Sequence, residues 1–229
     1  DKALAILAQH GAQVEAKTQI VRFPRDLVLK MMAKAPRYFT MGGREPSHDF
    51  QLKTGTTYFT TDGCGVETVD LETGARRPSR KSDVGMMARI SDYLPSVAFY
   101  WPMVSAQDHG TTAPLHELDA TYNNTLKHAQ SETIMGEAPA RYAVEMATVI
   151  AGSREELLRR PNFSLVVCTI APLIQDKDGI EGAMALAEAG VPVGFLAMPT
   201  LGTTAPATLA GALAMGDAEI ISAAVLMQM

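Results

Sequence analysis

The chain has 229 residues and a net charge of −5, and 47% of its residues are hydrophobic while 20% are charged. This balance excludes a disordered tail, a collagen-like repeat and a disulfide-rich scaffold, and it leaves no overall basic footprint for DNA or RNA. The length suits one large domain or two small ones, either of which can bury a sizeable core.

The first 95 residues predict a helical segment that includes a small β element. Apolar residues over 3–7 have helical spacing, and a second helix is expected over 25–34, between two prolines. The β-branched stretches 56–61 and 66–71 flank a Gly-rich tetrapeptide and predict a hairpin. A third helix is expected over 81–93.

From residue 97 onward, strands and helices are predicted to alternate regularly. The strand starts lie about 30 residues apart, which is the length of a βαβ unit and indicates parallel strands. The strands are almost continuously apolar, as expected of strands buried on both faces. We expect strands over 97–104, 132–135, 164–171 and 192–198, and helices over 115–128, 141–150, 155–159, 179–188 and 206–215 and from 217 to the end.

This alternation predicts the α/β class, and within it a TIM-type (β/α)8 barrel. No nucleotide-binding glycine motif follows any strand, which disfavours the nucleotide-binding form of the open doubly wound sheet. A barrel needs ~250 residues, so we expect 96–229 to form its N-terminal half and 1–95 to precede it. Because 220–227 is apolar on nearly all sides, we expect the chain to be a fragment of a longer protein, or its ordered part.

Neither a membrane segment nor a disulfide is expected. No charged residue occurs from Ala189 to Gly216, a stretch long enough to span a bilayer, but prolines and glycines divide it into strand, loop and helix. We therefore interpret it as protein core. The two cysteines, Cys64 and Cys168, lack metal-ligand spacing and suit a reducing compartment, so a cytoplasmic protein is expected.

Candidate functional residues follow from the rule that barrel enzymes carry their sites at the carboxyl ends of the strands. Asp108 and His109 form a ligand pair or an acid/base pair, or else they cap a helix. Glu137 lines a pocket or caps a helix, and Trp101 is a core residue or a cation–π wall. Loop backbone beside Thr203 and Thr204 binds an anion, or these residues cap the next helix. The full candidate set is Trp101, Gln107, Asp108, His109, Glu137, Thr203 and Thr204.

Several stretches of the sequence resemble the trimethylamine methyltransferase family. The most specific is Met-Pro-Thr-Leu-Gly-Thr-Thr-Ala-Pro-Ala-Thr-Leu-Ala-Gly-Ala-Leu at 198–213, which follows Leu-Val-Val-Cys-Thr-Ile-Ala-Pro-Leu at 165–173 and Gly-Val-Pro-Val at 190–193. Asp-Leu-Glu-Thr-Gly-Ala-Arg-Arg-Pro at 70–78 fits as well, as does Glu-Met-Ala at 145–147. The resemblance runs over essentially the whole chain.

The resemblance implies a (β/α)8 barrel preceded by helices and a small β element. It implies transfer of a methyl group from trimethylamine, or from a quaternary amine such as glycine betaine, to the Co(I) corrinoid of a partner protein. The cobalamin would then arrive with that partner, with no cofactor or metal bound tightly by this chain. A cytoplasmic homo-oligomer with a role in methanogenesis is also expected. The position that carries pyrrolysine in some members of the family falls beyond Met229.

Such chemistry agrees with the lack of a recognisable catalytic triad. Co(I) is already a strong nucleophile, and a quaternary ammonium leaves as a neutral amine, so the protein's task is positioning. Substrate-binding residues are then expected among the candidate set, with Thr203 and Thr204 holding a betaine carboxylate.

Two alternatives remain open at this point. The first is another barrel enzyme that acts on a carboxylated or phosphorylated metabolite, supported by the loop at 202–204. The second is an inactive fragment that associates with itself through an apolar edge.

Overall fold

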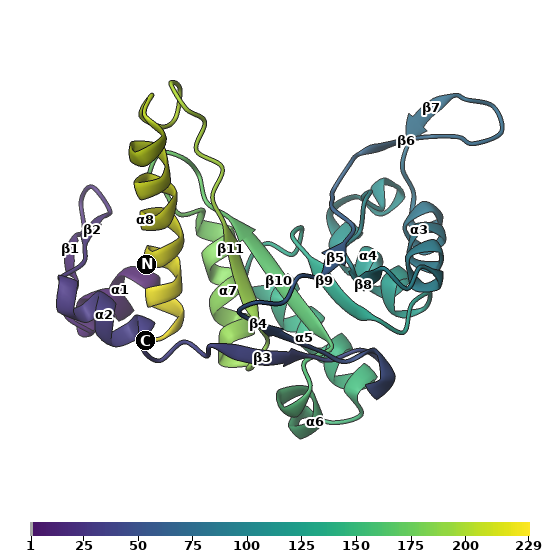
Figure 1. Cartoon of the computed structure of the whole chain (residues 1–229), viewed down its shortest axis with the longest axis horizontal. Coiled ribbons are helices and arrows are strands. Elements are labelled where there is room, and N and C mark those ends of the chain that lie inside the picture. The colour runs from purple at the N-terminus through teal and green to yellow at the C-terminus, as the bar shows by residue number, and fades with distance from the viewer. Residues whose placement is uncertain (1) are drawn as a thin grey trace.

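A computed structural model describes residues 2–229 and has an α/β fold built on one curled, five-stranded parallel sheet (Figure 1). The strand order is β11-β10-β9-β8-β5, and each neighbouring pair is parallel, so the sheet has the form of a half-barrel. The strands are β5 (Phe59–Thr60), β8 (Val97–Tyr100), β9 (His128–Ser131), β10 (Phe163–Cys168) and β11 (Val193–Leu196).

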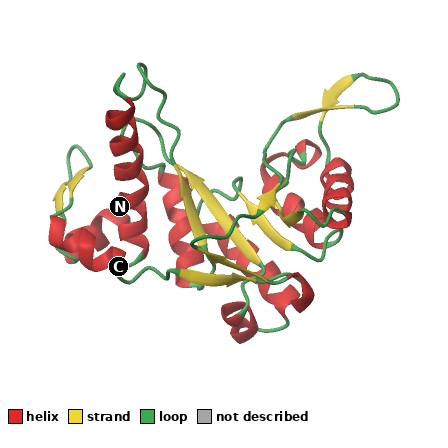
Figure 2. Cartoon of the chain, viewed as in Figure 1, coloured by secondary structure: helices red, strands yellow, loops and turns green. Residues whose placement is uncertain are grey.

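Helices lie between successive strands and cover the outer face of the sheet (Figure 2). Short polar side chains fix where several of them begin: Ser153, Asp176 and Thr208 each accept a hydrogen bond from a backbone N–H in the first turn. These helices are α3 (Lys81–Tyr93), α4 (Ala113–Tyr122), α5 (Glu137–Ala151), α6 (Arg154–Arg159), α7 (Lys177–Glu188) and α8 (Leu209–Met227), with a short 3-10 helix at Gln107–Thr112.

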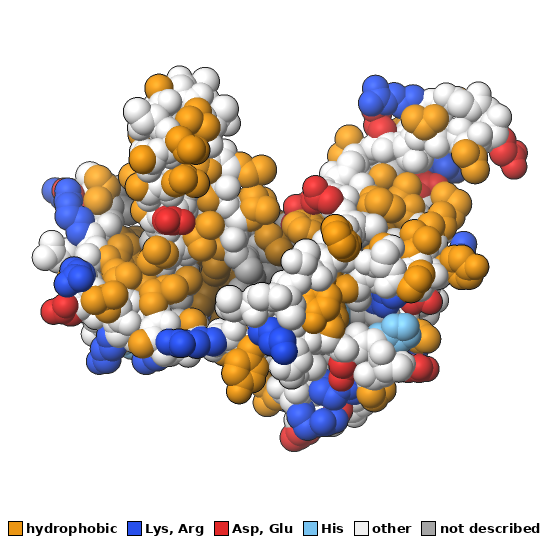
Figure 3. All heavy atoms as spheres, in the orientation of Figure 1, with side chains coloured by type: hydrophobic (Ala, Val, Ile, Leu, Met, Phe, Trp, Pro, Cys, Tyr) orange, Lys and Arg blue, Asp and Glu red, His pale blue; other side chains and the backbone are white. Residues whose placement is uncertain are grey.

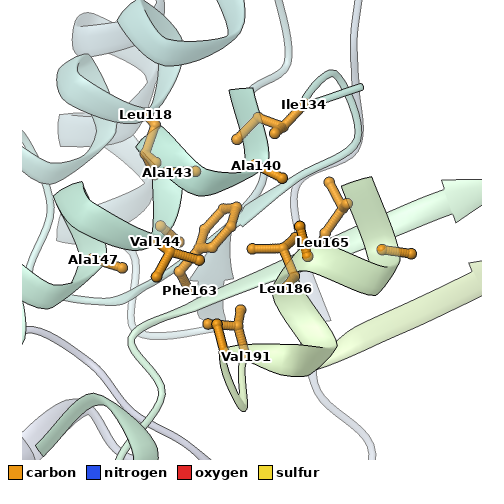
Figure 4. Packing of buried hydrophobic residues seen from close by; sticks show 14 of the residues in the cluster. Leu118, Ile134, Ala140, Ala143, Val144, Ala147, Phe163, Leu165, Leu186 and Val191 are labelled. Carbon is orange, nitrogen blue, oxygen red and sulfur yellow. The ribbon is translucent and has the colours of Figure 1, made fainter. Parts of the chain in front are cut away.

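The main core lies between the sheet and helices α5 and α7 (Figure 4). Phe163 and Leu165 of β10 and Leu186 of α7 are fully buried there. Ala140 and Ala147 of α5 are also fully buried, and their small side chains let this helix approach the sheet closely. The outward side chains of β10 therefore belong to the core, which leaves the inner face of the sheet to the alternate residues.

The first elements of the chain pack against the last helix. Leu7 of α1 joins Ile180, Ala223 and Leu226 in a second apolar cluster that holds both ends of the chain side by side (Figure 1). The elements of this region are α1 (Lys2–Gln9), β1 (Gln13–Glu15), β2 (Ile20–Arg22) and α2 (Arg25–Met32). The helices expected over 3–7 and 25–34 are thereby confirmed, whereas the β1–β2 hairpin was not predicted.

A second unpredicted hairpin lies across the amino edge of the sheet, formed by β3 (Tyr38–Met41) and β4 (Phe50–Lys53). Its connecting segment binds the loops that precede β9 and β10. The Gly42 backbone N–H donates to Pro161 O at 2.7 Å, and Arg160 Nε donates to Asp49 Oδ2 at 2.6 Å. This hairpin closes the amino edge and leaves the carboxyl edge of the sheet open.

His128 begins β9 and makes the stability of the fold depend on pH. It is fully buried, its Nδ1 donates to Gly42 O and Pro161 O, and its Nε2 accepts from Ser164 Oγ. Burial lowers the pKa of His128 from 6.5 to about 4, so the folded protein holds a neutral imidazole while the unfolded chain takes up a proton below pH 6.5.

We therefore expect the free energy of unfolding to fall by about 3 kcal/mol as the pH drops from 6.5 to 4. Urea unfolding at a series of pH values measures this loss. A His128→Asn variant does not titrate and should lack the slope, whereas His10→Asn, at an exposed position, should keep it. A flat stability between pH 6.5 and 5 in the unmodified protein would contradict this account of His128.

Some predicted elements are wrong. Stretches 56–61 and 66–71 do not pair with each other: β5 joins the parallel sheet, and β6 (Glu67–Val69) pairs with β7 (Arg76–Pro78). The strand expected over 132–135 lies at β9 instead, four residues earlier, so His128 is in a strand and α4 ends at Tyr122. The helices expected over 206–215 and from 217 onward are one helix, α8. By contrast, α3 has the expected bounds.

The uncharged stretch from Ala189 to Gly216 forms a strand, a loop and the first turns of α8, as expected. It is not all core, because Leu209 and Leu213 are 66% and 60% exposed. Within residues 2–229, α8 is the one helix long and apolar enough to cross a membrane by length and composition alone, a weak indication that core helices of soluble proteins also give.

Candidate functional site

The open carboxyl edge of the sheet begins with two loops that are joined through their backbones. The loop after β5 pairs with the loop after β8: Gly65 N–H donates to Met103 O at 2.9 Å, and Ser105 N–H donates to Gly65 O at 2.8 Å. A Cβ on Gly63 would lie only 1.8 Å from Pro102 O, so only glycine fits there. This pairing explains why the Gly-rich segment 62–65 packs against a loop rather than turning a hairpin.

Trp101 directly follows β8 and lies at the inner face of the sheet. The preceding Tyr100 points outward, where its hydroxyl donates to Val84 O of α3, so strand alternation directs Trp101 inward. The Trp101 backbone is tied to β5, because its N–H donates to Thr61 Oγ1 and its carbonyl accepts from the same hydroxyl. The side chain is only 9% exposed, yet its indole Nε1 has no hydrogen-bond partner.

The next strands add polar groups to the same face. Ala129 of β9 and Leu165 of β10 belong to the outer core, so alternation turns Gln130 and Glu132 inward from β9 and its end. Gln130 Nε2 donates to Ser164 Oγ of β10 at 3.1 Å, which confirms that these inner side chains meet. We call the set Asp62, Cys64, Trp101, Gln130, Glu132 and Cys168 the inner face.

Electrostatics show that the inner face concentrates negative charge. Burial raises the pKa of Glu132, and the charges of Asp62 and Glu117 raise it further. Burial, followed by the charges of Glu117 and Glu132, raises the pKa of Cys64 to about 12. Burial and the charge of Glu132 also raise the pKa of Cys168. Such a surface favours a cation, and its thiols stay protonated at neutral pH.

Two fully buried carboxylates hold the loops at the edge of this face, and each is 1% exposed. Glu117 of α4 accepts hydrogen bonds from the segments after β8 and β9. Glu219 of α8 accepts from Thr169 Oγ1 at 2.6 Å and from Leu173 N–H at 2.8 Å, both after β10. Each carboxylate is thus satisfied by hydroxyl and backbone donors, and neither forms a salt bridge within residues 2–229.

The predicted residues Gln107, Asp108 and His109 lie outside the inner face. Asp108 Oδ1 accepts from the backbone N–H of Lys81, so it caps the start of α3. The ring of His109 stacks on that of His116 with centroids 3.6 Å apart, and Gln107 is exposed. The structure therefore brings Asp108 and His109 close to each other at 3.9 Å, but it places them against α3 and α4.

The other predicted residues are also separate from Trp101. Glu137 is exposed at the first turn of α5 and pairs with Arg141 at 2.6 Å. Thr203 and Thr204 lie in an exposed loop, where their hydroxyls bind the backbone of Thr200. The expectation that they cap the next helix is wrong, because α8 begins at Leu209 and Thr208 caps it. Binding of an anion at this loop stays a prediction.

The sequence prediction missed Glu132 and Gln130 as members of this edge, because it placed the second strand four residues too late. It missed Glu117 because nothing in the helix pattern marks this residue as buried. The one weak signal that could have located the strand is Ala129, an apolar residue between the polar His128 and Gln130. Within residues 2–229 no group of three or more His, Cys, Asp or Glu side chains is arranged to hold a metal ion.

The inner face is an open surface. Figure 3 shows the molecule hollowed between α8 and the part that carries α3, with apolar side chains along the walls. Two shallow depressions of about 210 and 230 Å³ lie elsewhere, one beside Asp92 and Asn124 and the other beside Arg141 and Glu188. Neither contains a residue of the inner face.

Comparison with known proteins gives consistent matches along the whole chain. The family described as trimethylamine methyltransferase matches residues 1–229. The trimethylamine methyltransferase MttB of Desulfitobacterium hafniense (strain DSM 10664 / DCB-2) is 32% identical over 229 residues, covering 100% of this chain and 46% of that protein. MttB of Methanosarcina barkeri is 30% identical and is covered to 47%.

A glycine betaine methyltransferase of Desulfitobacterium hafniense (strain Y51) is also similar, with 25% identity over 232 residues, 100% of this chain and 47% of that protein. The chain thus spans about half the length of the curated relatives that it matches. These relatives differ in the methylated amine that their names specify.

Proposed function

Because the chain belongs to the trimethylamine methyltransferase family, we propose that it takes part in transferring a methyl group from a methylated ammonium compound, trimethylamine or a quaternary amine such as glycine betaine, to the Co(I) corrinoid of a partner protein. The observation that carries this proposal is the inner face, where a buried tryptophan follows β8 and the carboxylates of Asp62 and Glu132 follow the neighbouring strands β5 and β9.

We assign the binding of the ammonium group to Trp101, Glu132 and Asp62. The indole ring attracts a cation through its π face, and the two carboxylates supply opposite charge. Partial burial of Glu132 beside the buried Trp101 makes this attraction stronger than it would be in water, whereas Asp62 is exposed and its charge is more strongly screened. Gln130 lies next to Trp101 along the sheet and offers a neutral polar contact.

The residues of the inner face position the substrate rather than react with it. The partner's Co(I) would supply the nucleophile, and the electron pair of the broken C–N bond would stay on nitrogen. A quaternary substrate, or trimethylamine in its protonated form, would then leave as a neutral amine. The raised pKa values of Cys64 and Cys168 keep both thiols protonated, so they do not compete for the methyl group. Trp101 and Glu132 would hold the ammonium group at the open face.

The partner protein would approach this open edge. Ile170, Leu173 and Met198 are exposed apolar residues on the loops after β10 and β11, and they suit contact with the broad apolar surface of a corrinoid ring. We further propose that the half-barrel belongs to a closed (β/α)8 barrel, because the relatives are about twice as long, and that the protein forms a homo-oligomer. The two free cysteines suit the cytoplasm.

An assay of methyl transfer to Co(I) cobalamin tests the proposed activity. Trimethylamine or glycine betaine is the methyl donor, the partner protein is present, and the change in cobalt absorbance is the readout. Loss of transfer in Glu132→Gln, with Asp108→Asn unchanged, would support the assignment of the site to the inner face. Transfer that depends on Asp108 and not on Glu132 would overturn the assignment.

Cation binding should weaken in acid because Glu132 must be ionised to attract an ammonium group. The protein should bind tetramethylammonium fully at pH values well above the pKa of Glu132, and it should lose this affinity as the pH falls through that pKa. Because the pKa of Glu132 is raised from 4.5, the loss occurs at a pH above 4.5. Titration calorimetry at a series of pH values measures this change. The Glu132→Gln variant should bind weakly at every pH, and an unchanged acid profile in that variant would contradict the prediction.

A further inference from the structure

One buried carboxylate joins the two loops that carry the proposed cation-binding residues. Glu117 Oε1 accepts from Ser105 Oγ at 2.6 Å and from Ala106 N–H at 3.1 Å, both on the segment that follows β8 and Trp101. Its other oxygen, Oε2, accepts from Thr133 Oγ1 at 2.6 Å, next to Glu132. A single side chain on α4 thus spans the gap between two neighbouring strand ends.

We infer that Glu117 is a positioning residue for the proposed methylammonium site: it fixes the loops after β8 and β9 relative to each other and so sets Trp101 against Glu132. This inference rests on the proposed function. Glu117 is 1% exposed and lies behind the loops that line the open face, so it acts through those loops rather than by touching the substrate.

The geometry explains why a glutamate suits this position. Two oxygens at opposite ends of one rigid carboxylate accept from two loops at once, and hydrogen bonds to an ionised acceptor are stronger than neutral ones. The negative charge also adds to that of Asp62 and Glu132, because Glu117 contributes to the raised pKa values of Cys64 and Glu132. A substituted amide keeps the size of the side chain but loses both the charge and one accepting oxygen.

Glu219 offers a matched control within the same chain. It is buried to the same extent, it lies on α8, and it accepts from the hydroxyl and backbone donors of the loop after β10. Thr169 corresponds to Thr133, because each donates its hydroxyl to one of these two carboxylates. The two glutamates therefore have similar structural roles, but only Glu117 touches the loops next to Trp101 and Glu132.

The experiment compares Glu117→Gln with Glu219→Gln by titrating tetramethylammonium and following the fluorescence of Trp101, which is the one tryptophan in the sequence. We expect both variants to lose thermal stability. Glu117→Gln should bind about 10-fold more weakly, the effect of losing about 1.4 kcal/mol, and Glu219→Gln should bind like the unmodified protein.

Thr133→Val and Thr169→Val form a second pair of variants, which separates the effect of Glu117 on loop position from the effect of its charge. This pair also keeps the test possible if Glu117→Gln does not fold. Thr133→Val breaks one bridge but keeps the carboxylate, so it should weaken binding without moving the pH at which binding is lost. Glu117→Gln should move that pH lower, because the neighbouring charge that raises the pKa of Glu132 is gone. Thr169→Val should change neither.

Equal losses of affinity in the Glu117 and Glu219 variants, or in Thr133→Val and Thr169→Val, would overturn the positioning role and leave the proposed function intact. Failure of the unmodified protein to bind tetramethylammonium would overturn both. Weaker binding in the Glu117 and Thr133 variants alone is the result that supports the inference.

Discussion

Replacing Trp101 with leucine is expected to weaken tetramethylammonium binding by about 30-fold, the loss of a desolvated cation–π contact of about 2 kcal/mol. The indole is 9% exposed, and it is the aromatic residue that directly follows β8 at the inner face. Leucine keeps an apolar side chain at the position but presents no π face. Titration calorimetry measures the change without relying on the fluorescence that the substitution removes.

Trp101→Phe is the matched control for this prediction. Phenylalanine retains a π face of lower strength, so this variant should bind tetramethylammonium with an affinity between those of the unmodified protein and Trp101→Leu. Circular dichroism establishes that both variants are folded. A folded Trp101→Leu protein with unchanged affinity would show that the ring serves only as packing.

Replacing Gly63 with alanine is expected to cost about 3 kcal/mol or more of unfolding free energy, at the upper end of the range for overpacking. The added Cβ would lie 1.8 Å from Pro102 O, which is backbone and cannot turn aside. The substitution should also separate the loops after β5 and β8, and therefore should lower cation affinity along with stability. Urea unfolding and tetramethylammonium titration measure the two effects.

Gly55→Ala provides the control, because Gly55 has a positive φ of +84° but nothing within 4 Å of its added Cβ. Backbone strain alone then costs about 1 kcal/mol, with no effect on the site. If the two alanine variants lost equal stability, the close approach of Gly63 to Pro102 would not be what holds these loops together.

The sequence predicts the alternating helices and strands well where each strand has an apolar face and helices have clear ends. Helix α3 has its predicted bounds, and its start is fixed by Asp83, whose Oδ2 accepts from the backbone N–H of Arg80 at 2.9 Å. Strand β10 is found to within a few residues because its outward residues Phe163, Leu165 and Val167 form the core. Membership of the trimethylamine methyltransferase family, inferred from the motif at 198–213, is confirmed by the match over the whole chain.

The inner face could not be predicted in the same way, because the strands that line it alternate between residues that face the outer core and residues that face inward. In β9, Ala129 packs outward while His128 and Gln130 face inward as polar groups, so a search for an apolar run selects the next segment instead. Glu117 carries the pattern of an ordinary solvent-facing helix residue. Only the tertiary arrangement, which brings Ser105 and Thr133 to its two oxygens, shows that it is buried.

The candidate residues differ in how close to the sheet the structure places them, and the reason is their distance along the chain from a strand end. Trp101 is predicted near the mouth of a strand over 97–104; the strand ends at Tyr100, so Trp101 directly follows it at the carboxyl edge. Asp108 follows several residues later, by which point the chain has left the sheet and the side chain caps α3 instead. Thr203 and Thr204 belong to a long loop whose length moves them away from the helix start at Leu209.

The most direct test of this account is a titration of Trp101 fluorescence with tetramethylammonium, alongside inorganic phosphate. The inner face should give a saturable change with tetramethylammonium, with trimethylamine or glycine betaine competing for the same site, and no change with phosphate. A change with phosphate alone would contradict the proposed cation site and favour a barrel enzyme for phosphorylated metabolites. No response to tetramethylammonium would contradict the assignment of substrate binding to Trp101 and its neighbouring carboxylates.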